Sequence, residues 1–134
     1  MPLLIIYLIC INQPNFEDII VEKFKRTLLI TGATKGIGYA TALRLHQQGH
    51  QVIGIARQES EFPGDLFLAD LTDENETAET FNVIHKKYKV DGIVNNVGIA
   101  LIQSLSEIKL DDFRNIIDLN LRPALQAMQF LCME

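Results

Sequence analysis

The sequence predicts an α/β protein built on a doubly wound parallel sheet, and three observations lead to that fold class. From Thr27 onward, short apolar runs alternate with helical patterns, which is the order expected of parallel strands joined by crossover helices. The runs are apolar at their centres, as in strands that helices cover on both faces. A glycine-rich turn joins the first run to the first helical pattern. The 134 residues suffice for one ordinary domain.

The first 24 residues do not fit this alternation. Residues 3–11 are continuously apolar, but the run is shorter than the ~20 residues that span a bilayer. No Lys or Arg precedes the run and no small-residue cleavage site follows it, which argues against a secretory signal. Pro14 ends the run, and apolar residues at helical spacing predict a short helix over 16–24. We expect residues 1–24 to be an atypical extension and residues 25–134 a partial domain of the predicted α/β class.

The remaining elements follow from apolar periodicity and end signals. Strands are expected at 27–31, 52–56, 66–69 and 91–95, and helices at 39–48, from Thr72 to Lys87, and from Asp111 to the end. Gly49 ends the first helix, and acids open and cations close the second, which suits the helix dipole. The strand order should be third, second, first, fourth. The sheet would then be truncated after the fourth strand and its helix, leaving that strand at an open edge.

Composition excludes several function classes. Twelve Lys and Arg against seventeen Asp and Glu give a net charge of -5, which disfavours nucleic-acid binding. The two cysteines, Cys10 and Cys132, are too few for a disulfide framework and wrongly spaced for zinc. His46 and His50 lie on either side of the helix stop at Gly49, so no metal site is expected. The composition favours a cytoplasmic protein without membrane segments.

The chemistry concentrates in Thr31–Gly38, which reads T-G-x-x-x-G-x-G between a predicted strand and a predicted helix. Glycine permits positive φ and close approach of a ligand, and the first N–H groups of a helix attract an anion. The turn therefore predicts a phosphate-binding site. Its spacing differs from G-x-G-x-x-G, so the turn alone leaves other nucleotide or methyl-donor cofactors open.

Three further motifs make the chain resemble the short-chain dehydrogenase/reductase family. Asp70-Leu71 follows the third strand, Asn95-Asn96-Val97-Gly98 follows the fourth, and Asn120 lies in the last helix. The resemblance covers residues 26–133, the amino-terminal half of a family member. It implies a Rossmann-type fold and hydride transfer between a nicotinamide cofactor and a small carbonyl or alcohol substrate, with homo-oligomers pairing through the last helices of the intact protein.

The resemblance also implies roles for individual residues. Asp70 would bind the adenine amino group, and the N-N-V-G motif would steady the sheet beside the cofactor. Asn120 would be catalytic, bending its helix near Pro123 so that its main-chain carbonyl holds a water of the proton relay. The expected cofactor-binding residues are Gly32, Thr34, Lys35, Gly36, Ile37, Gly38, Arg57, Asp70, Leu71, Asn95, Asn96, Val97 and Gly98.

The family's catalytic Ser, Tyr and Lys are not found in this sequence. Tyr7, Tyr39 and Tyr88 are followed four residues later by Ile, Leu and Gly, so no Y-x-x-x-K occurs. Ser104 and Ser106 precede the strand that would deliver the catalytic Ser. The chain alone is therefore expected to be inactive. A non-catalytic dinucleotide-binding or interaction module, with the extension supplying an edge strand, remains the alternative.

Charge predicts the choice of cofactor. NAD is usually held by an acid about 20 residues beyond the glycines, whereas the 2′-phosphate of NADP needs cations. The acid is missing, and Arg57 stands at the end of the second strand. Lys35 can approach the same phosphate from the glycine turn. We therefore expect NADP(H) to be preferred over NAD(H).

Overall fold

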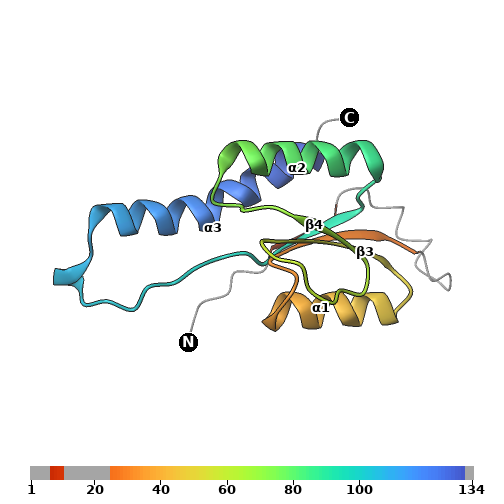
Figure 1. Ribbon diagram of the computed structural model, residues 1–134, viewed down its shortest axis with the longest axis horizontal. Helices are drawn as coiled ribbons and strands as arrows, with labels where there is room; N and C mark the ends of the chain where they lie inside the picture. Colours follow the sequence, from red (N-terminus) through yellow and green to blue (C-terminus); the bar gives the residue numbers. More distant parts are fainter. Residues whose placement is uncertain (1–6, 11–24, 132–134) are drawn as a thin grey trace.

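The computed structural model describes residues 7–10 and 25–131. Helix α1 covers one face of a central sheet, and α2 and α3 cover the other (Figure 1). The elements in chain order are β1 Tyr7–Cys10, β2 Thr27–Thr31, α1 Gly36–Gln47, β3 Gln51–Ala56, β4 Asp65–Leu68, α2 Glu74–Lys87, β5 Gly92–Asn95, a 3-10 turn at Leu105–Glu107, and α3 Leu110–Leu131. The predicted fold class is confirmed, because helices flank a parallel sheet on both sides.

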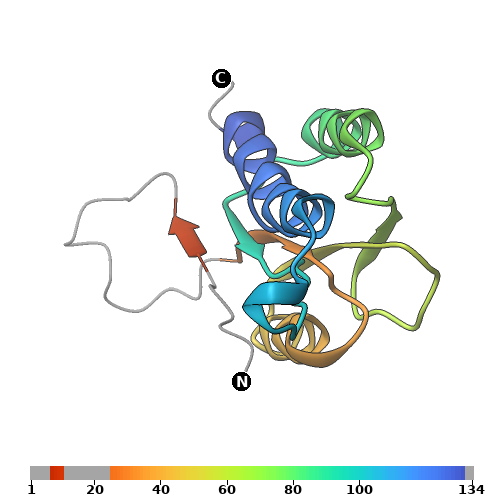
Figure 2. The same ribbon diagram turned by 90° about the vertical axis from the view of Figure 1, so that its left-hand side faces the viewer.

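The strands lie in the order β1-β5-β2-β3-β4. Strands β5, β2, β3 and β4 are parallel to one another, in the order that the sequence predicts. The predicted open edge at β5 is wrong. Strand β1 pairs antiparallel with β5, from Tyr7 opposite Asn95 to Cys10 opposite Gly92, and lies beyond it in Figure 2. An apolar segment of the expected extension thus satisfies backbone groups that the edge would otherwise expose. The helix expected at 16–24 lies outside the described residues.

Local backbone chemistry shifts several element ends from their predicted places. Helix α1 begins at Gly36 rather than Tyr39, directly after the extended Lys35. Asp73, not Thr72, caps α2, because its side chain accepts hydrogen bonds from the N–H groups of Asn75 and Glu76, both at 2.9 Å. Strand β4 lies one residue earlier than predicted. The stop at Gly49 is confirmed by its φ of 89°.

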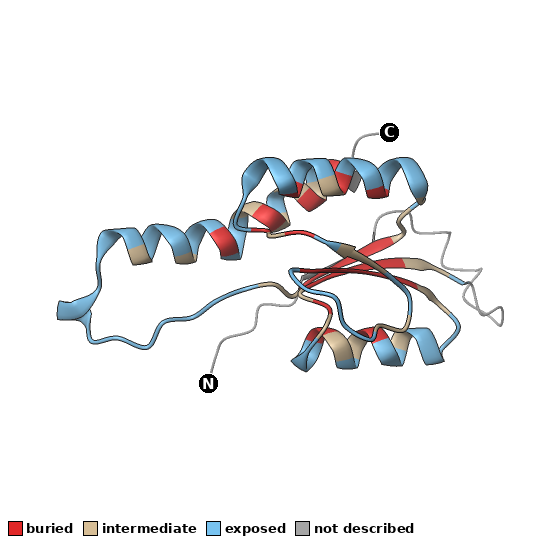
Figure 3. Cartoon of the chain, in the orientation of Figure 1, coloured by how far each residue is buried: buried red, intermediate tan, exposed pale blue. Residues whose placement is uncertain are grey.

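The core consists of two clusters, one on each face of the sheet (Figure 3). Successive side chains of a strand point to opposite faces, so Leu29 and Ile30 enter different clusters. The larger cluster lies under α2 and α3 and includes Ile53, Ile55, Phe81, Ile84, Ile93, Leu119, Ala127 and Phe130. The smaller lies over α1 and includes Val52, Val94, Ala33 and Ala42. Burial on both faces explains the uninterrupted apolar runs of the strands.

Helix α3 continues through Pro123, which is fully buried. The helix buries Leu119, Ala127 and Phe130 against the larger cluster. Five large apolar side chains remain exposed along the helix, namely Leu110, Phe113, Ile117, Leu121 and Leu125. Across residues 7–10 and 25–131, none of the helices combines the length and hydropathy needed to cross a bilayer.

Phe81 ties α2 to α3, because its ring stacks on Phe130 with centroids 5.8 Å apart. We expect Phe81→Ala to lower the free energy of unfolding by about 3–5 kcal/mol, since the cavity left behind forfeits both burial and contacts. Urea denaturation followed by circular dichroism measures this loss. Val83→Ala on the same helix is the control, because Val83 is 46% exposed and its loss should stay within about 0.5 kcal/mol. Equal effects of the two substitutions would contradict the packing described.

Candidate functional site

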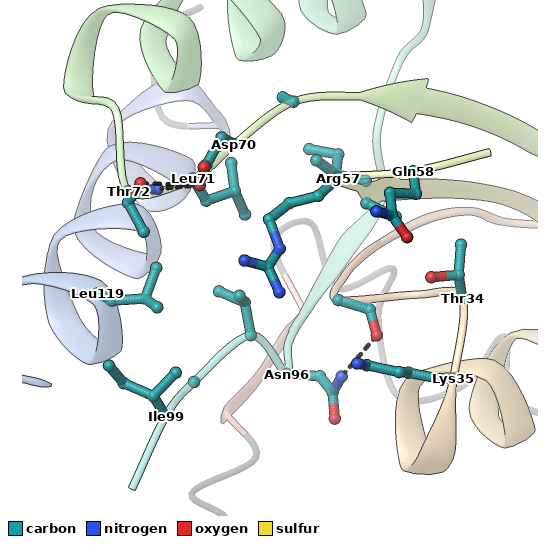
Figure 4. A pocket seen from close by; sticks show the side chains of 16 residues that line it. Thr34, Lys35, Arg57, Gln58, Asp70, Leu71, Thr72, Asn96, Ile99 and Leu119 are labelled. Carbon is teal, nitrogen blue, oxygen red and sulfur yellow. Dashed lines mark hydrogen bonds between the residues drawn. The ribbon is translucent and has the colours of Figure 1, made fainter. Parts of the chain in front are cut away.

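A pocket of about 620 Å³ opens where the parallel strands β2, β3, β4 and β5 end (Figure 4). Ligands of open α/β sheets bind at this position, beyond the carboxyl ends of the strands. The lining residues are Gly32, Thr34, Lys35, Ile55, Ala56, Arg57, Gln58, Ala69, Asp70, Leu71, Thr72, Asn96, Val97, Gly98, Ile99 and Leu119.

The glycine turn forms one wall of the pocket, and its glycines are there for distinct reasons. Gly32 and Gly36 have φ of 65° and 56°, in the left-handed region that side chains disfavour. Gly38 is buried with ordinary φ, but a Cβ there would collide with the carbonyl oxygen of Gly32 and approach Asn96 Nδ2 to 2.5 Å. The third glycine therefore lets α1 start in direct contact with the turn.

The first turn of α1 carries neither a side-chain cap nor an acid. Helix α2 differs, because Asp73 caps it and Glu74 and Glu76 lie in its first turn. The N–H groups at the start of α1 therefore keep their partial positive charge for another partner. The exposed Lys35, directly before the helix, adds a full positive charge. This end of the pocket is suited to a phosphate group.

Asn96 joins the glycine turn to the end of β5. Its side-chain amide donates to the carbonyl oxygens of Thr31 at 3.1 Å and Gly32 at 3.0 Å. The hydroxyl oxygen of Thr31 accepts from the N–H groups of Asn96 and Val97 at 3.0 and 3.1 Å. These four bonds fix the distance between the ends of β2 and β5, and hence the geometry of the pocket residues that follow them.

Asp70 lies on the opposite wall. One of its carboxylate oxygens, Oδ1, accepts from the N–H of Thr72 at 3.0 Å and from the Thr72 hydroxyl at 2.8 Å. These bonds, first from the N–H and then from the hydroxyl, lower the pKa of Asp70, with a smaller contribution from Arg57. Asp70 therefore stays ionised at neutral pH, and its Oδ2 accepts no hydrogen bond from the part of the chain that the structure describes.

Asn120 contacts the loop after β5 rather than the pocket itself. Its side chain accepts from the N–H of Ile99 at 2.8 Å and donates to the Ile99 carbonyl at 2.9 Å. This pair of bonds fixes the pocket-lining segment that follows Gly98. Asn95 is buried, and its Oδ1 lacks a hydrogen-bond partner within the described residues.

The structure brings most, but not all, of the expected site residues to the pocket. Nine line it, namely Gly32, Thr34, Lys35, Arg57, Asp70, Leu71, Asn96, Val97 and Gly98. Gly36, Ile37, Gly38, Asn95 and Asn120 lie next to the lining without joining it. Sequence reasoning did not assign the other seven lining residues to the site, which are Ile55, Ala56, Gln58, Ala69, Thr72, Ile99 and Leu119. The signal for Gln58 was its place just after β3, and the signal for Thr72 was its place next to Asp70-Leu71, whereas Leu119 reads as an ordinary core residue.

Cations outnumber acids in the lining. Lys35 and Arg57 are both exposed, and Asp70 is the acid that lines the pocket with them. Arg57 extends into the pocket between the wall that holds Asp70 and the one that holds Lys35 (Figure 4). In the described part of the chain, no three His, Cys, Asp or Glu side chains gather closely enough to hold a metal ion.

Comparison with known proteins gives one family. The family model described as "short chain dehydrogenase" matches residues 26–134. The chain is 32% identical over 122 residues to a 3beta-hydroxysteroid dehydrogenase of Mediterraneibacter gnavus, covering 80% of this chain and 44% of that protein. It is 37% identical over 110 residues to an NADPH-dependent pterin aldehyde reductase of Arabidopsis thaliana, covering 72% and 46%. The chain thus spans a little under half the length of these relatives.

Solved structures agree with this result. A variant of ElxO with NADPH bound has a TM-score of 0.70 and 32% identity, over 79% of this chain and 48% of that one. The NADH-dependent reductase A1-R′ complexed with NAD has a TM-score of 0.71 and 28% identity, over 80% of this chain and 51% of that one. Both nicotinamide cofactors therefore occur among the neighbours of this fold.

Thr72 determines how readily Asp70 takes up a proton. We expect the carboxyl of Asp70 to titrate below its ordinary pKa, and Thr72→Val to raise that pKa by removing the hydroxyl donor. Because the pKa is lowered on folding, the stability that Asp70 contributes is present above its unfolded pKa and disappears as the pH falls through the folded pKa. Carbon-13 NMR of the carboxyl group measures both titrations. Thr80→Val on α2 is the control, and a Thr72→Val titration that matches wild type would refute the role of the hydroxyl.

Proposed function

Because the chain belongs to the short chain dehydrogenase family, we propose that residues 25–134 are the cofactor-binding part of an NADP-dependent oxidoreductase. The intact protein would transfer hydride between NADP(H) and a small carbonyl or alcohol substrate. The observation that carries the proposal is the pocket at the strand ends, where an uncapped helix N-terminus and a glycine turn face Asp70. The residues present fit two parts of a dinucleotide: the glycine turn suits its pyrophosphate, and Asp70 suits its adenine.

The fit begins at the glycine turn. The cofactor's pyrophosphate would lie against Gly32, Thr34, Gly36, Ile37 and Gly38, where the α1 N–H groups lack a side-chain cap. The open space around Gly36, with nothing within 4 Å of a Cβ position, leaves room for phosphate oxygens. Bound there, the cofactor would supply the hydride that the protein's own side chains lack.

The fit continues along the opposite wall. The free Oδ2 of Asp70 would accept from the adenine amino group, with Leu71 beside the ring. Asn95, Asn96, Val97 and Gly98 would support the nicotinamide half from the end of β5. The Asn96 bonds to the glycine turn favour this arrangement, because they fix β5 and the phosphate site to each other.

The preference for NADP(H) is supported by the pocket's charges. A 2′-phosphate carries about two negative charges at neutral pH, and Arg57 and Lys35 both line the pocket. Gln58, which follows Arg57, is uncharged, so an acid does not occupy the first two positions after β3. A ribose hydroxyl needs such an acid, whereas a phosphate is repelled by it.

Catalysis would require residues beyond those in this sequence. We assign Asn120 a place in the proton relay through its main-chain carbonyl, and its side-chain bonds to Ile99 hold it at the pocket's edge. No Tyr of the sequence has Lys four residues later. The 134-residue chain therefore binds cofactor without transferring hydride. The non-catalytic module is the weaker alternative, because the named relatives are enzymes.

The wider setting is also part of the proposal. Residues 1–24 are an extension whose described strand β1 adds to the sheet. The intact protein is a cytoplasmic homo-oligomer, acting on neither nucleic acid nor membranes. Support for pairing comes from the exposed apolar side chains of α3, including Phe113 and Ile117, which would be covered by another helix.

The cofactor preference can be tested by reversing one charge. We expect NADPH to bind more tightly than NADH. Arg57→Asp should lower the affinity for NADPH about ten- to a hundredfold, because a charge-assisted hydrogen bond is lost. NADH should be little affected. Isothermal titration measures both affinities. Arg44→Asp, an exposed cation on the last turn of α1, is the control. Equal affinities of wild type for the two cofactors would defeat the preference.

Binding without turnover is a second expected outcome. Purified chain mixed with NADPH and a panel of small aldehydes and ketones should consume no NADPH, because the Tyr and Lys that move the proton are lacking. Absorbance of NADPH at saturating cofactor follows the reaction. Steady consumption that Gly36→Asp abolishes would show that hydride transfer proceeds without those residues, and would overturn this part of the proposal.

A further inference from the structure

We propose that Arg122 is a positioning residue for the cofactor pocket, holding the Asp70–Thr72 loop in its binding conformation from below. This inference rests on the proposed function, because it assigns Arg122 to the same site. Arg122 lies in α3, outside the pocket lining. Its side chain is only 15% exposed.

The guanidinium of Arg122 bonds to main-chain atoms of this loop. Its Nη2 donates to the carbonyl oxygens of Leu71 and Thr72, both at 3.0 Å. Both residues line the pocket, and Thr72 also holds the carboxylate of Asp70. Two sets of hydrogen bonds therefore fix the conformation of the loop. One joins Thr72 to Asp70, and the other joins the loop's carbonyl groups to Arg122.

The guanidinium is itself held in place by α3. Asp118 accepts from Nε and Nη2, both at 2.8 Å, and Gln126 accepts from Nη1 at 2.9 Å. This fork fixes the plane of the guanidinium, which a lysine ammonium could not do. Asp118 and Arg122 shift each other's pKa toward the charged forms, Asp118 down and Arg122 up. Gln126 also donates to the carbonyl of Glu74 at 3.3 Å, so the network reaches the first turn of α2.

Helix α3 thereby contacts both walls of the pocket. Asn120 holds the Ile99 segment on one side of the helix, and Arg122 holds the Leu71–Thr72 carbonyls on the other. Leu119 fills the space between them and lines the pocket. The distance between the adenine-side loop and the segment after β5 is therefore set by polar bonds from one helix.

The first experiment measures loop order without cofactor. We expect Arg122→Met to speed amide hydrogen exchange over residues 69–73 at least about fivefold, because the loop loses both carbonyl partners. Exchange in β2 and β3 should stay as in wild type. Arg114→Met is the matched control, since Arg114 lies on the same helix and is 70% exposed in a surface pair with Asp111. Unchanged exchange over 69–73 would overturn the positioning role.

The second experiment measures NADPH affinity by isothermal titration at a temperature where every variant is folded. We expect Arg122→Met to weaken binding on the order of tenfold, Arg122→Lys to weaken it less, and Arg114→Met to leave it unchanged. An Arg122→Met affinity equal to wild type in the folded protein would show that the residue is only structural. If wild type binds no dinucleotide while the exchange difference persists, the proposed function fails and the role of Arg122 in loop order stands.

Discussion

The tie between Thr31 and Asn96 is the constraint on which the pocket depends. Strands β2 and β5 lie side by side but are separated in sequence by α1, β3, β4 and α2, and the loops that follow them diverge unless something joins them. Here one side-chain amide and one hydroxyl make four hydrogen bonds across the ends of β2 and β5. A different conformation of the glycine turn would break these bonds and leave their donors and acceptors unsatisfied.

The site's electrostatics follow from what the helices lack as much as from what they carry. In helix α2, Asp73 caps the N-terminus and Glu74 and Glu76 lie in the first turn, whereas α1 has no acid in its first turn. Two helices of one small fold thus differ in whether their N–H groups are satisfied internally. Of these two helices, α1 therefore has the N-terminus that is suited to an anion, and Lys35 and Arg57 add positive charge nearby.

Sequence patterns predicted the parallel sheet, its strand order and most of the lining, because these depend on local periodicity and on residues just after strands. They failed where distant residues decide the outcome. The sequence favours an appendage and leaves an edge strand from the extension as the alternative, since nothing local says that residues 7–10 pair with β5. Asp73 outcompeted Thr72 as the α2 cap because Thr72 was already engaged with Asp70. The sequence did not predict the hydrogen bonds of Arg122 for the same reason, because the carbonyl groups that accept them lie fifty residues or more away in the chain.

The antiparallel pairing of β1 has a consequence for the order in which the chain folds. Strand β1 leaves the ribosome before β2, β3 and β4, yet its partner β5 is made after them. Those three parallel strands can assemble with α1 and α2 before β1 is paired, because β2 pairs with β3 and β3 with β4, the next strand made in each case. Closing β1 onto β5 then joins the most distant parts of the described sheet, the kind of contact that slows folding most. The nascent chain thus carries an apolar, unpaired strand until β5 has been made.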